Sequence, residues 1–399
     1  MKKKRSISVS AALMLVMLAV VATFNVVFFV AAEYYNKRLE GIQVLEQEYK
    51  KFKEVAEVVS KSFIGEYDAA KAMDGAMAGY IDGLGDKWSH YYTKEQVEAI
   101  QESDKNTYSG IGVTLSADAE TPYLITAVAK GGPAEKAGVR PMDVIVSVNG
   151  MLSESYESRD ALISDVRGEK GTSVKIEVQR GEEKLSFDIT RDEIPNECVE
   201  TRMLDNGVGL VVITGFETGV DKEFEAKVTD LVAQGASALI FDLRFNPGGY
   251  VDVMYKMLDL LLPEGLVISM TDRTGSKPVE YFSDAHRIEL PMAVIVNEYS
   301  YSAAEFFAAA TQEYGVATIV GDHTTGKGYA QNLLILSDGS GINLSTARYY
   351  TPKGASLAST GVTPDVSVSL TEDQMYSFYT LKDADDSQLQ AAIAAVQGQ

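Results

Sequence analysis

The chain has 399 residues, of which 46% are hydrophobic and 23% charged, and a formal net charge of −21. These values exclude a disordered chain, allow two or three folded units, and argue against nucleic acid or anionic lipid bound through a basic patch. The single cysteine, Cys198, excludes an intrachain disulfide and a cysteine-based metal cluster.

The N-terminus begins with a short basic segment followed by a long apolar run. Residues 1–6 contain four cations, and the 26 residues 7–32 contain no charged side chain. This run exceeds the ~20 residues that a helix needs to span a bilayer and the roughly 7–15 apolar residues of a cleaved signal. With Glu33 after the run, the cations predict a transmembrane signal-anchor whose basic end is cytoplasmic. The alternative is a signal peptide cleaved after Ala32.

A heptad pattern follows the apolar run, in a region predicted to be helical over residues 33–105. Two rows of residues recur every seven positions: Ile42, Tyr49, Ala56 and Phe63 in one, and Leu45, Phe52 and Val59 in the other. This pattern predicts either a short coiled coil that makes a homodimer or one amphipathic helix that packs on its own domain. After Gly65, short helices are predicted over residues 66–103, with the turn GLGDKWSHYYTKEQ between them.

From Tyr108 the apolar period changes from that of helices to that of strands. YSGIGVTLS, PYLITAVA, DVIVSVNG, SVKIEVQR and LSFDITRDE alternate apolar and polar residues and are separated by Gly, Pro and Asp turns. One helix-like stretch, residues 158–166, interrupts them. Residues 106–193 are therefore predicted to form a compact, mostly β module.

After Pro195 the pattern is that of an α/β fold. Apolar strands and helices alternate in the order GVGLVVITGF, 221–234, ALIFDLRF, 250–262, MAVIVNE and 302–314. Strands that are apolar throughout predict a largely parallel sheet covered on both faces, within residues 194–365, and a helical segment follows at 366–399. Active sites in such sheets lie in loops at the carboxyl ends of the strands. The loops of interest are FNPGGY, NEYSYS and GDHTTGKG.

The stretch GDHTTGKGYAQN is similar to the start of a phosphate-binding loop. It matches GxxxxGK, but Gly328 replaces the Ser or Thr that holds magnesium, and a strand follows where a helix is needed. A nucleotide site is therefore not expected. A histidine triad is the next candidate, and none of the three histidines has the sequence context of a catalytic base, although a triad assembles in space. They are His90, His286 and His323.

Ser302 and Lys327 offer a different chemistry. Ser302 follows a buried strand and begins the helix SAAEFFAAA; SAAE also matches a helix N-cap with Glu305 as the capping-box acid, and the sequence leaves both roles open. A serine hydroxyl is a weak nucleophile until a base takes its proton, which a lysine does if burial lowers its pKa. Lys327, between two glycines after an apolar strand, is the predicted base. The predicted oxyanion donors are backbone amides of Ala303 and of Gly248 or Gly249.

The motifs resemble those of the carboxyl-terminal processing proteases, also called tail-specific proteases. The resemblance runs in order through residues 75–365, over GLGDKWSHYY, a PDZ module, DLRFNPGG, VNEYSYSAAE, TTGKGYAQ, ARYYTPKG and GVTPD. It implies an α/β, crotonase-like (ClpP/crotonase-type) serine protease core. It also implies that Ser302 is the nucleophile, Lys327 the base and Gln331 the residue that orients the lysine, with Gly248 and Ala303 as oxyanion donors.

The β module is then similar to a PDZ domain, with YSGIGV as its carboxylate-binding loop. Such a loop offers backbone amides to the terminal carboxylate of a peptide that adds as a strand to the sheet edge. The residues implied in peptide binding are Tyr108, Ser109, Gly110, Ile111, Gly112 and Val113.

Three positions depart from the pattern of the family. Tyr299 and Tyr301 stand where Gly and Ala are usual, and Phe245 stands where Asn is common. They bear on substrate preference more than on mechanism, because all three mechanistic side chains are present.

The sequence thus predicts a membrane-anchored serine endopeptidase that acts outside the cytoplasmic membrane on proteins with exposed, apolar C-terminal tails. This chemistry needs no metal and no cofactor, and no nucleic acid is expected as a partner. The alternative from another class is a non-catalytic PDZ adaptor tethered to the membrane.

Overall fold

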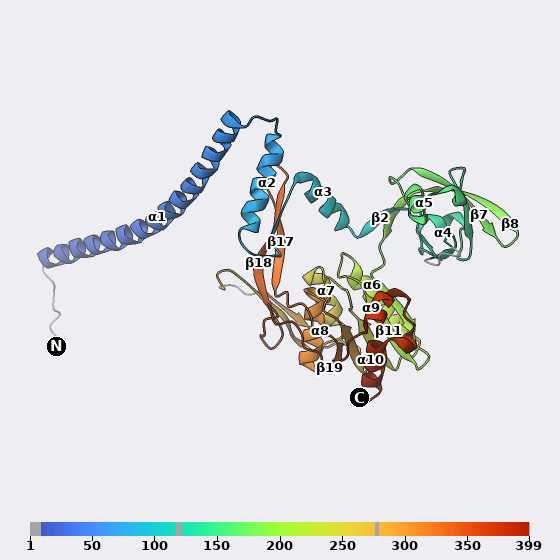
Figure 1. The fold of residues 1–399 in the computed structure, drawn as a ribbon. Helices are drawn as coiled ribbons and strands as arrows, with labels where there is room; N and C mark the ends of the chain where they lie inside the picture. The colour runs from blue at the N-terminus through green and yellow to red at the C-terminus, as the bar shows by residue number, and fades with distance from the viewer. Residues whose placement is uncertain (1–8, 117–121, 276–278, 399) are drawn as a thin grey trace. The chain divides into compact units, whose positions relative to one another are not determined.

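A computed structural model describes residues 9–116, 122–275 and 279–398 (Figure 1). For residues 11–12 and 35–48 it describes the backbone alone. The chain divides into two compact units, Met1–Met73 and Asp74–Gln399. The basic segment predicted at residues 1–6 lies outside the described residues.

One long helix, α1 (Val9–Ser62), makes up most of the first unit. Its stretch Leu13–Tyr34 has a mean hydropathy of 2.7 and no buried residue, so its length and composition suit a membrane span, as they would a signal sequence. Of the two heptad rows, the side chains of Ile42 and Leu45 lie outside the described residues. Tyr49 and Phe63 are exposed, and the coiled coil therefore stays a prediction.

Two short helices, α2 (Ala69–Asp82) and α3 (Lys94–Ser103), precede the β module. A capping box begins α3, in which Thr93 and Gln96 each accept a hydrogen bond from the other's backbone N–H. The segment between the helices contains a strand, β1 (His90–Tyr92), where the sequence predicted only a turn. Because β1 pairs with β18 (Gly341–Tyr350), near the other end of the chain, no local pattern announces it.

The β module consists of antiparallel strand pairs around one apolar core. Its elements are β2 (Thr107–Gly110), β3 (Val113–Leu115), β4 (Ile125–Val128), α4 (Pro133–Ala137), β5 (Val144–Val148), β6 (Met151–Leu152), η1 (Ser153–Ser155), α5 (Arg159–Val166), β7 (Ser173–Arg180), β8 (Glu183–Thr190) and β9 (Asp192–Pro195). The predicted helix at 158–166 is confirmed as α5, with Ser158 as its N-cap. The helix α4 has five residues, too few for a helical period to be recognised.

A six-stranded sheet, all of it in described residues, forms the centre of the α/β region. Its order is β10 (Val199–Met203), β11 (Val208–Ile213), β12 (Ala238–Asp242), β15 (Met292–Val296), β16 (Ala317–Gly321) and β19 (Val366–Ser367). All neighbouring pairs are parallel except β10 with β11. The predicted, largely parallel sheet is thus confirmed.

Helices cover both faces of this sheet. Successive residues of a strand point to opposite faces of the sheet. On one face Phe241 packs with α6 (Val220–Ala233), α7 (Val251–Asp259) and α8 (Ala303–Tyr314). On the other face Ile240 packs with α10 (Ser387–Gln397). The C-terminal segment before α10 contains α9 (Glu372–Tyr376), η2 (Phe378–Thr380) and η3 (Asp383–Asp385). A buried ion-pair group fastens this segment to the end of β12: Arg244 contacts Asp242 at 2.6 Å and Asp386 at 2.9 Å.

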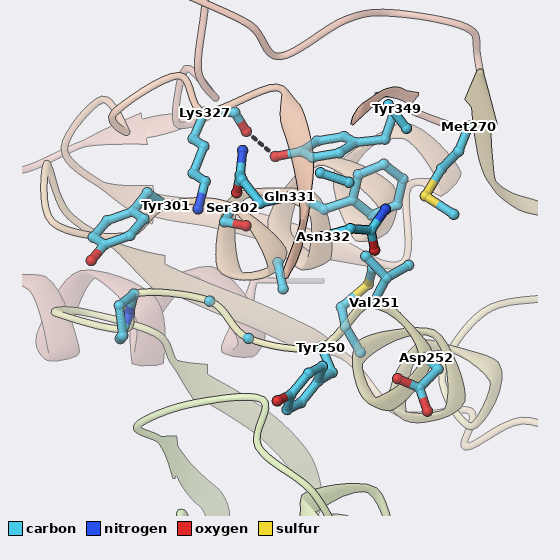
Figure 2. A pocket seen from close by; sticks show the side chains of 18 of the residues that line it. Tyr250, Val251, Asp252, Met270, Tyr301, Ser302, Lys327, Gln331, Asn332 and Tyr349 are labelled. Atoms are coloured by element: carbon cyan, nitrogen blue, oxygen red, sulfur yellow. Dashed lines mark hydrogen bonds between the residues drawn. The ribbon is translucent and has the colours of Figure 1, made fainter. Parts of the chain in front are cut away.

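A second sheet, which the sequence did not predict, stands beside the first. It pairs β1, β18, β13 (Gly265–Asp272) and β14 (Val279–Ser283), with β17 (Tyr329–Ile335) added to β18. The strands β17 and β18 continue from the loop that contains Lys327. They bring Gln331 and Tyr349 to the edge of the central sheet (Figure 2).

Candidate active site

Three loops meet at the carboxyl edge of the central sheet. Residues 243–250, 297–302 and 322–328 follow β12, β15 and β16, which are parallel neighbours. With the second sheet they line a cavity of about 740 Å³ (Figure 2). The lining includes the residues that the sequence assigned to catalysis: Ser302, Lys327, Gln331, Gly248 and Ala303.

Ser302 lies at the junction of its loop and α8, in a conformation that non-glycine residues rarely adopt. Its φ is 60° and its ψ −121°, which is a strained backbone for an L-residue. Its N–H donates to Glu305 Oε2 at 3.0 Å. A helix N-terminus and a backbone hydrogen bond thus hold the serine at the cavity wall.

The glycine loop approaches Ser302 so closely that a side chain does not fit. A Cβ atom added to Gly248, whose φ is +95°, would lie 2.8 Å from Ser302 Cβ and 2.9 Å from the Ala303 nitrogen. The Gly248 N–H donates to Asn246 Oδ1 at 2.8 Å and is therefore engaged. Within the described residues the Gly249 N–H has no acceptor, and Ala303, as the first residue of α8, has no acceptor within its helix.

Glu305 is buried completely and joins the Ser302 helix to the Lys327 loop. One carboxylate oxygen accepts hydrogen bonds from Thr324 Oγ1 and the Gly326 N–H, both at 2.6 Å. The other accepts from the N–H groups of Ser302 at 3.0 Å and Lys327 at 2.8 Å. Sequence reasoning recognised the capping contact to Ser302 and missed the contacts to the loop, because nothing local links residues 305 and 327.

Lys327 points toward Ser302 across the cavity (Figure 2). Burial lowers the pKa of its amine, while the carboxylates of Glu305 and Asp86 act in the opposite direction. Among the described residues, Lys327 Nζ has no hydrogen bond or ion pair. Two aromatic rings lie beside it, with Nζ 4.6 Å from the ring centroid of Trp88 and 5.8 Å from that of Tyr301.

Gln331 lines the cavity but does not contact the lysine amine through a hydrogen bond. Its amide donates to the Tyr329 carbonyl and to Ser345 Oγ, both at 3.0 Å. Gln331 therefore lies in the predicted cavity, but its amide donates to Tyr329 and Ser345 and not, as predicted, to Lys327.

Tyr349 of β18 joins the candidate site from the second sheet. Its buried phenol donates to the Lys327 backbone carbonyl, and its side chain lines the same cavity as Ser302 (Figure 2). Burial raises the pKa of this phenol, which keeps it protonated. Sequence reasoning missed Tyr349, whose only signal was its place in the motif ARYYTPKG.

The structure gives no support to the two competing chemistries. Lys327 is followed by the strand β17 and not by a helix, as a phosphate site would require. Among the described residues that line the cavity there is no histidine. His90 lies on β1, His286 lies beside Asp284 in an exposed loop, and His323 lies beside Thr363.

The β module has a groove of its own, about 280 Å³ in volume, between β2, β3 and α5. Five of the six residues predicted to bind peptide line it: Tyr108, Gly110, Ile111, Gly112 and Val113. Ser109 does not, and its hydroxyl is buried without a hydrogen-bond partner in the described residues. The rest of the lining consists of Thr114, the apolar side chains of Leu115, Ile145, Ile163 and Val166, and the basic Arg159 and Arg167.

Comparison with known proteins agrees with this architecture. Residues 207–368 match peptidase family S41, and residues 124–180 match the PDZ domain. The carboxy-terminal processing protease CtpA of Bacillus subtilis is 34% identical over 327 residues, which cover 82% of this chain and 70% of the relative. A probable CtpA-like serine protease of Staphylococcus aureus (strain COL) is 30% identical over 347 residues, covering 86% and 69%.

The chain belongs to the carboxy-terminal processing protease family. It is a serine-type peptidase with a PDZ domain. Among solved structures, the photosystem II D1 C-terminal processing protease aligns with a TM-score of 0.48 at 26% identity, over 79% of this chain and 86% of that one.

The three departures of this protease from the family pattern fall into two places. Phe245 and Tyr299 stack on each other, with ring centroids 5.4 Å apart, and Phe378 packs against Phe245 at 4.7 Å. Tyr301 instead packs against Trp88, with centroids 5.8 Å apart, beside the lysine amine. Tyr301 is thus the departure that bears on Lys327.

Proposed function

We propose that this protease is anchored in a membrane by α1 and cleaves extracytoplasmic proteins near their C-termini through a Ser302–Lys327–Gln331 site. One observation carries the proposal: Ser302, at the start of α8, and the half-buried Lys327, whose pKa is lowered by burial, face the same cavity. A neutral amine beside a serine hydroxyl is a sufficient base for acyl transfer.

In the proposed cycle, neutral Lys327 takes the proton of Ser302 as Oγ attacks a peptide carbonyl. The ammonium then gives this proton to the leaving amine, and an acyl-enzyme remains. Water attacks the acyl-enzyme with Lys327 again as the base. The Ala303 N–H and that of Gly248 or Gly249 stabilise the oxyanion. For catalysis, the Gln331 amide exchanges its hydrogen bond to Ser345 for one to Lys327. If Gly248 is the oxyanion donor, its N–H is released from its hydrogen bond to Asn246.

The groove of the PDZ domain is the proposed binding site for substrate tails. Its apolar side chains, with Ile111 and Val166 among them, suit an apolar C-terminal residue, and Arg167 adds positive charge for the terminal carboxylate. A tail bound there adds as a strand to the sheet edge, which satisfies its backbone groups.

The membrane part of the proposal rests on α1 and on charge. Leu13–Tyr34 is strongly apolar and has no buried residue, and cations precede it in the sequence. Cations near the end of a span favour the cytoplasmic side, so the peptidase is proposed to lie on the other side.

Digestion of an unfolded protein with an apolar C-terminus tests the proposal. The full chain in detergent is compared with Ser302→Ala, with mass spectrometry of the fragments. We expect cleavage by the parent alone, and weaker cleavage when the substrate ends in an amide. Cleavage by both proteins would reject Ser302 as nucleophile. Tail binding by both without cleavage would favour the non-catalytic PDZ adaptor.

The pH dependence of cleavage tests the base. Only the neutral amine accepts a proton, and burial lowers the pKa of Lys327, so kcat/KM should rise with pH and reach half its maximum below the ~10.4 of an ordinary lysine. The measurement is kcat/KM of a fluorogenic peptide from pH 6 to about 10, with substrate stability checked at each pH. A flat profile would count against a lysine base.

A further inference from the structure

Trp88 has no role in the proposed cycle, yet it lies directly beside the proposed base. The turn that contains it is fastened to β18, because the Ser345 N–H donates to Ser89 Oγ at 3.1 Å and Asn343 donates to the Trp88 carbonyl at 3.5 Å. Ser89 in turn donates to Asp86 at 2.6 Å. These hydrogen bonds hold the turn at Trp88 and at Ser89, and so fix the position of the indole.

Trp88 and Tyr301 together form an aromatic cage around the end of the lysine side chain. Lys327 Nζ lies 4.6 Å from the Trp88 centroid and 5.8 Å from the Tyr301 centroid, and both distances are within the ~6 Å over which a ring face attracts a cation. The rings lie 5.8 Å apart at an interplanar angle of 32°. Ring faces attract the ammonium and not the neutral amine.

Charged and titratable groups on every neighbouring element act on the same amine. The carboxylates of Asp86, in the turn, and Glu305, on α8, attract the ammonium. Lys87 Nζ also lies 4.6 Å from the Trp88 centroid, so a second cation contacts this ring. The phenol of Tyr349, on β18, is protonated and uncharged. The aromatic cage thus adds to the carboxylates in favouring the charged lysine, whereas burial opposes it.

We propose that the aromatic cage of Trp88 and Tyr301 stabilises the charged form of the Lys327 side chain where it faces Ser302. The inference rests on the proposed role of Lys327 as base. Trp88 and Tyr301 are positioning residues in it, because they act through Lys327. The cage slows catalysis near neutral pH by holding the lysine in its unreactive form. Tyr301 supplies the second ring of the cage, 5.8 Å from the amine.

Chemical labelling measures the effect without requiring turnover. In the full chain with Ser302→Ala, the rate of acetylation of Lys327 by acetic anhydride is followed against pH by mass spectrometry, because only the neutral amine reacts. Trp88→Leu keeps apolar cover and removes the indole face. We expect its midpoint to fall by about 0.5–1 pH unit, the size of one cation–π contact. Tyr301→Leu should give a smaller fall in the same direction.

The matched control is Tyr299→Leu, which changes a tyrosine two residues away that stacks on Phe245. Its midpoint should not move. An unchanged or raised midpoint in both Trp88→Leu and Tyr301→Leu would overturn the proposal, since burial alone would then govern the lysine. Should Trp88→Leu fail to fold, Tyr301→Leu decides the question, because the Tyr301 side chain is only half-buried and its replacement disturbs little of the core.

Activity separates this inference from the proposed function. With Ser302 intact, Trp88→Leu should shift the kcat/KM profile to lower pH by the same ~0.5–1 pH unit. At pH 7 this shift raises the fraction of neutral Lys327, and so the rate, roughly three- to tenfold. If the pH midpoint of Lys327 acetylation falls in Trp88→Leu while the pH profile of kcat/KM does not move, the cage acts on Lys327 as proposed and Lys327 is not the base. If neither moves in an enzyme that still requires Lys327, the cage proposal alone fails.

Discussion

Replacing Lys327 by methionine is expected to lower kcat by roughly 10⁴-fold, the upper range for removal of a general base. Methionine is unbranched like lysine and keeps the apolar contact with Trp88 and Tyr301, so the fold should be unaffected. The measurement is kcat and KM of the full chain on a peptide substrate. We expect KM to change little, because the amine acts on the serine and not on the bound peptide.

Lys327→Arg is the control that separates a base from a positive charge. Arginine keeps the cation and the cation–π contacts, but it does not lose its proton in proteins and so does not accept the serine proton. It should therefore be as inactive as the methionine variant. Substantial activity in Lys327→Arg would mean that the charge, and not proton transfer, is what the reaction needs from this position.

Much of this site could be predicted from the sequence because its parts are marked locally. The apolar run before NEYSYS predicts a buried strand, and SAAE predicts the helix start that places Ser302 at the edge of the sheet. The same holds for the strand before Lys327. Parallel neighbours then bring these loops together without further information.

What the sequence did not predict depends on contacts between distant segments. The strand β1 exists because it pairs with β18, and this pairing brings Trp88 to Lys327. Gln331 was expected to contact the lysine, but Ser345 on the facing strand takes its amide. Trp88 is far from Lys327 in the sequence and Ser345 lies on the strand after that of Gln331, and neither contact leaves a period or a cap to recognise.

Glu305→Gln is expected to damage both stability and activity. The carboxylate accepts from two donors on each oxygen, whereas an amide has one oxygen, so two buried donors would face an NH₂ group. At ~1–3 kcal/mol for each unsatisfied donor, the free energy of unfolding should fall by about 2–6 kcal/mol. Urea unfolding followed by fluorescence of Trp88, the single tryptophan, measures this beside the site.

Glu298→Gln gives the matched control, because Glu298 is an exposed acid in the same loop as Ser302 and should tolerate the change.

The pH profile of Glu305→Gln then distinguishes the two roles of Glu305, as a hydrogen-bond acceptor and as a negative charge. Loss of the hydrogen bonds displaces Ser302 and the Lys327 loop, which lowers kcat at every pH. Loss of the charge removes a group that favours the lysine ammonium, so the midpoint of the residual activity should move to lower pH. Low activity with an unmoved midpoint would assign Glu305 a purely structural part, and parental stability would contradict its role as the link between the two halves of the site.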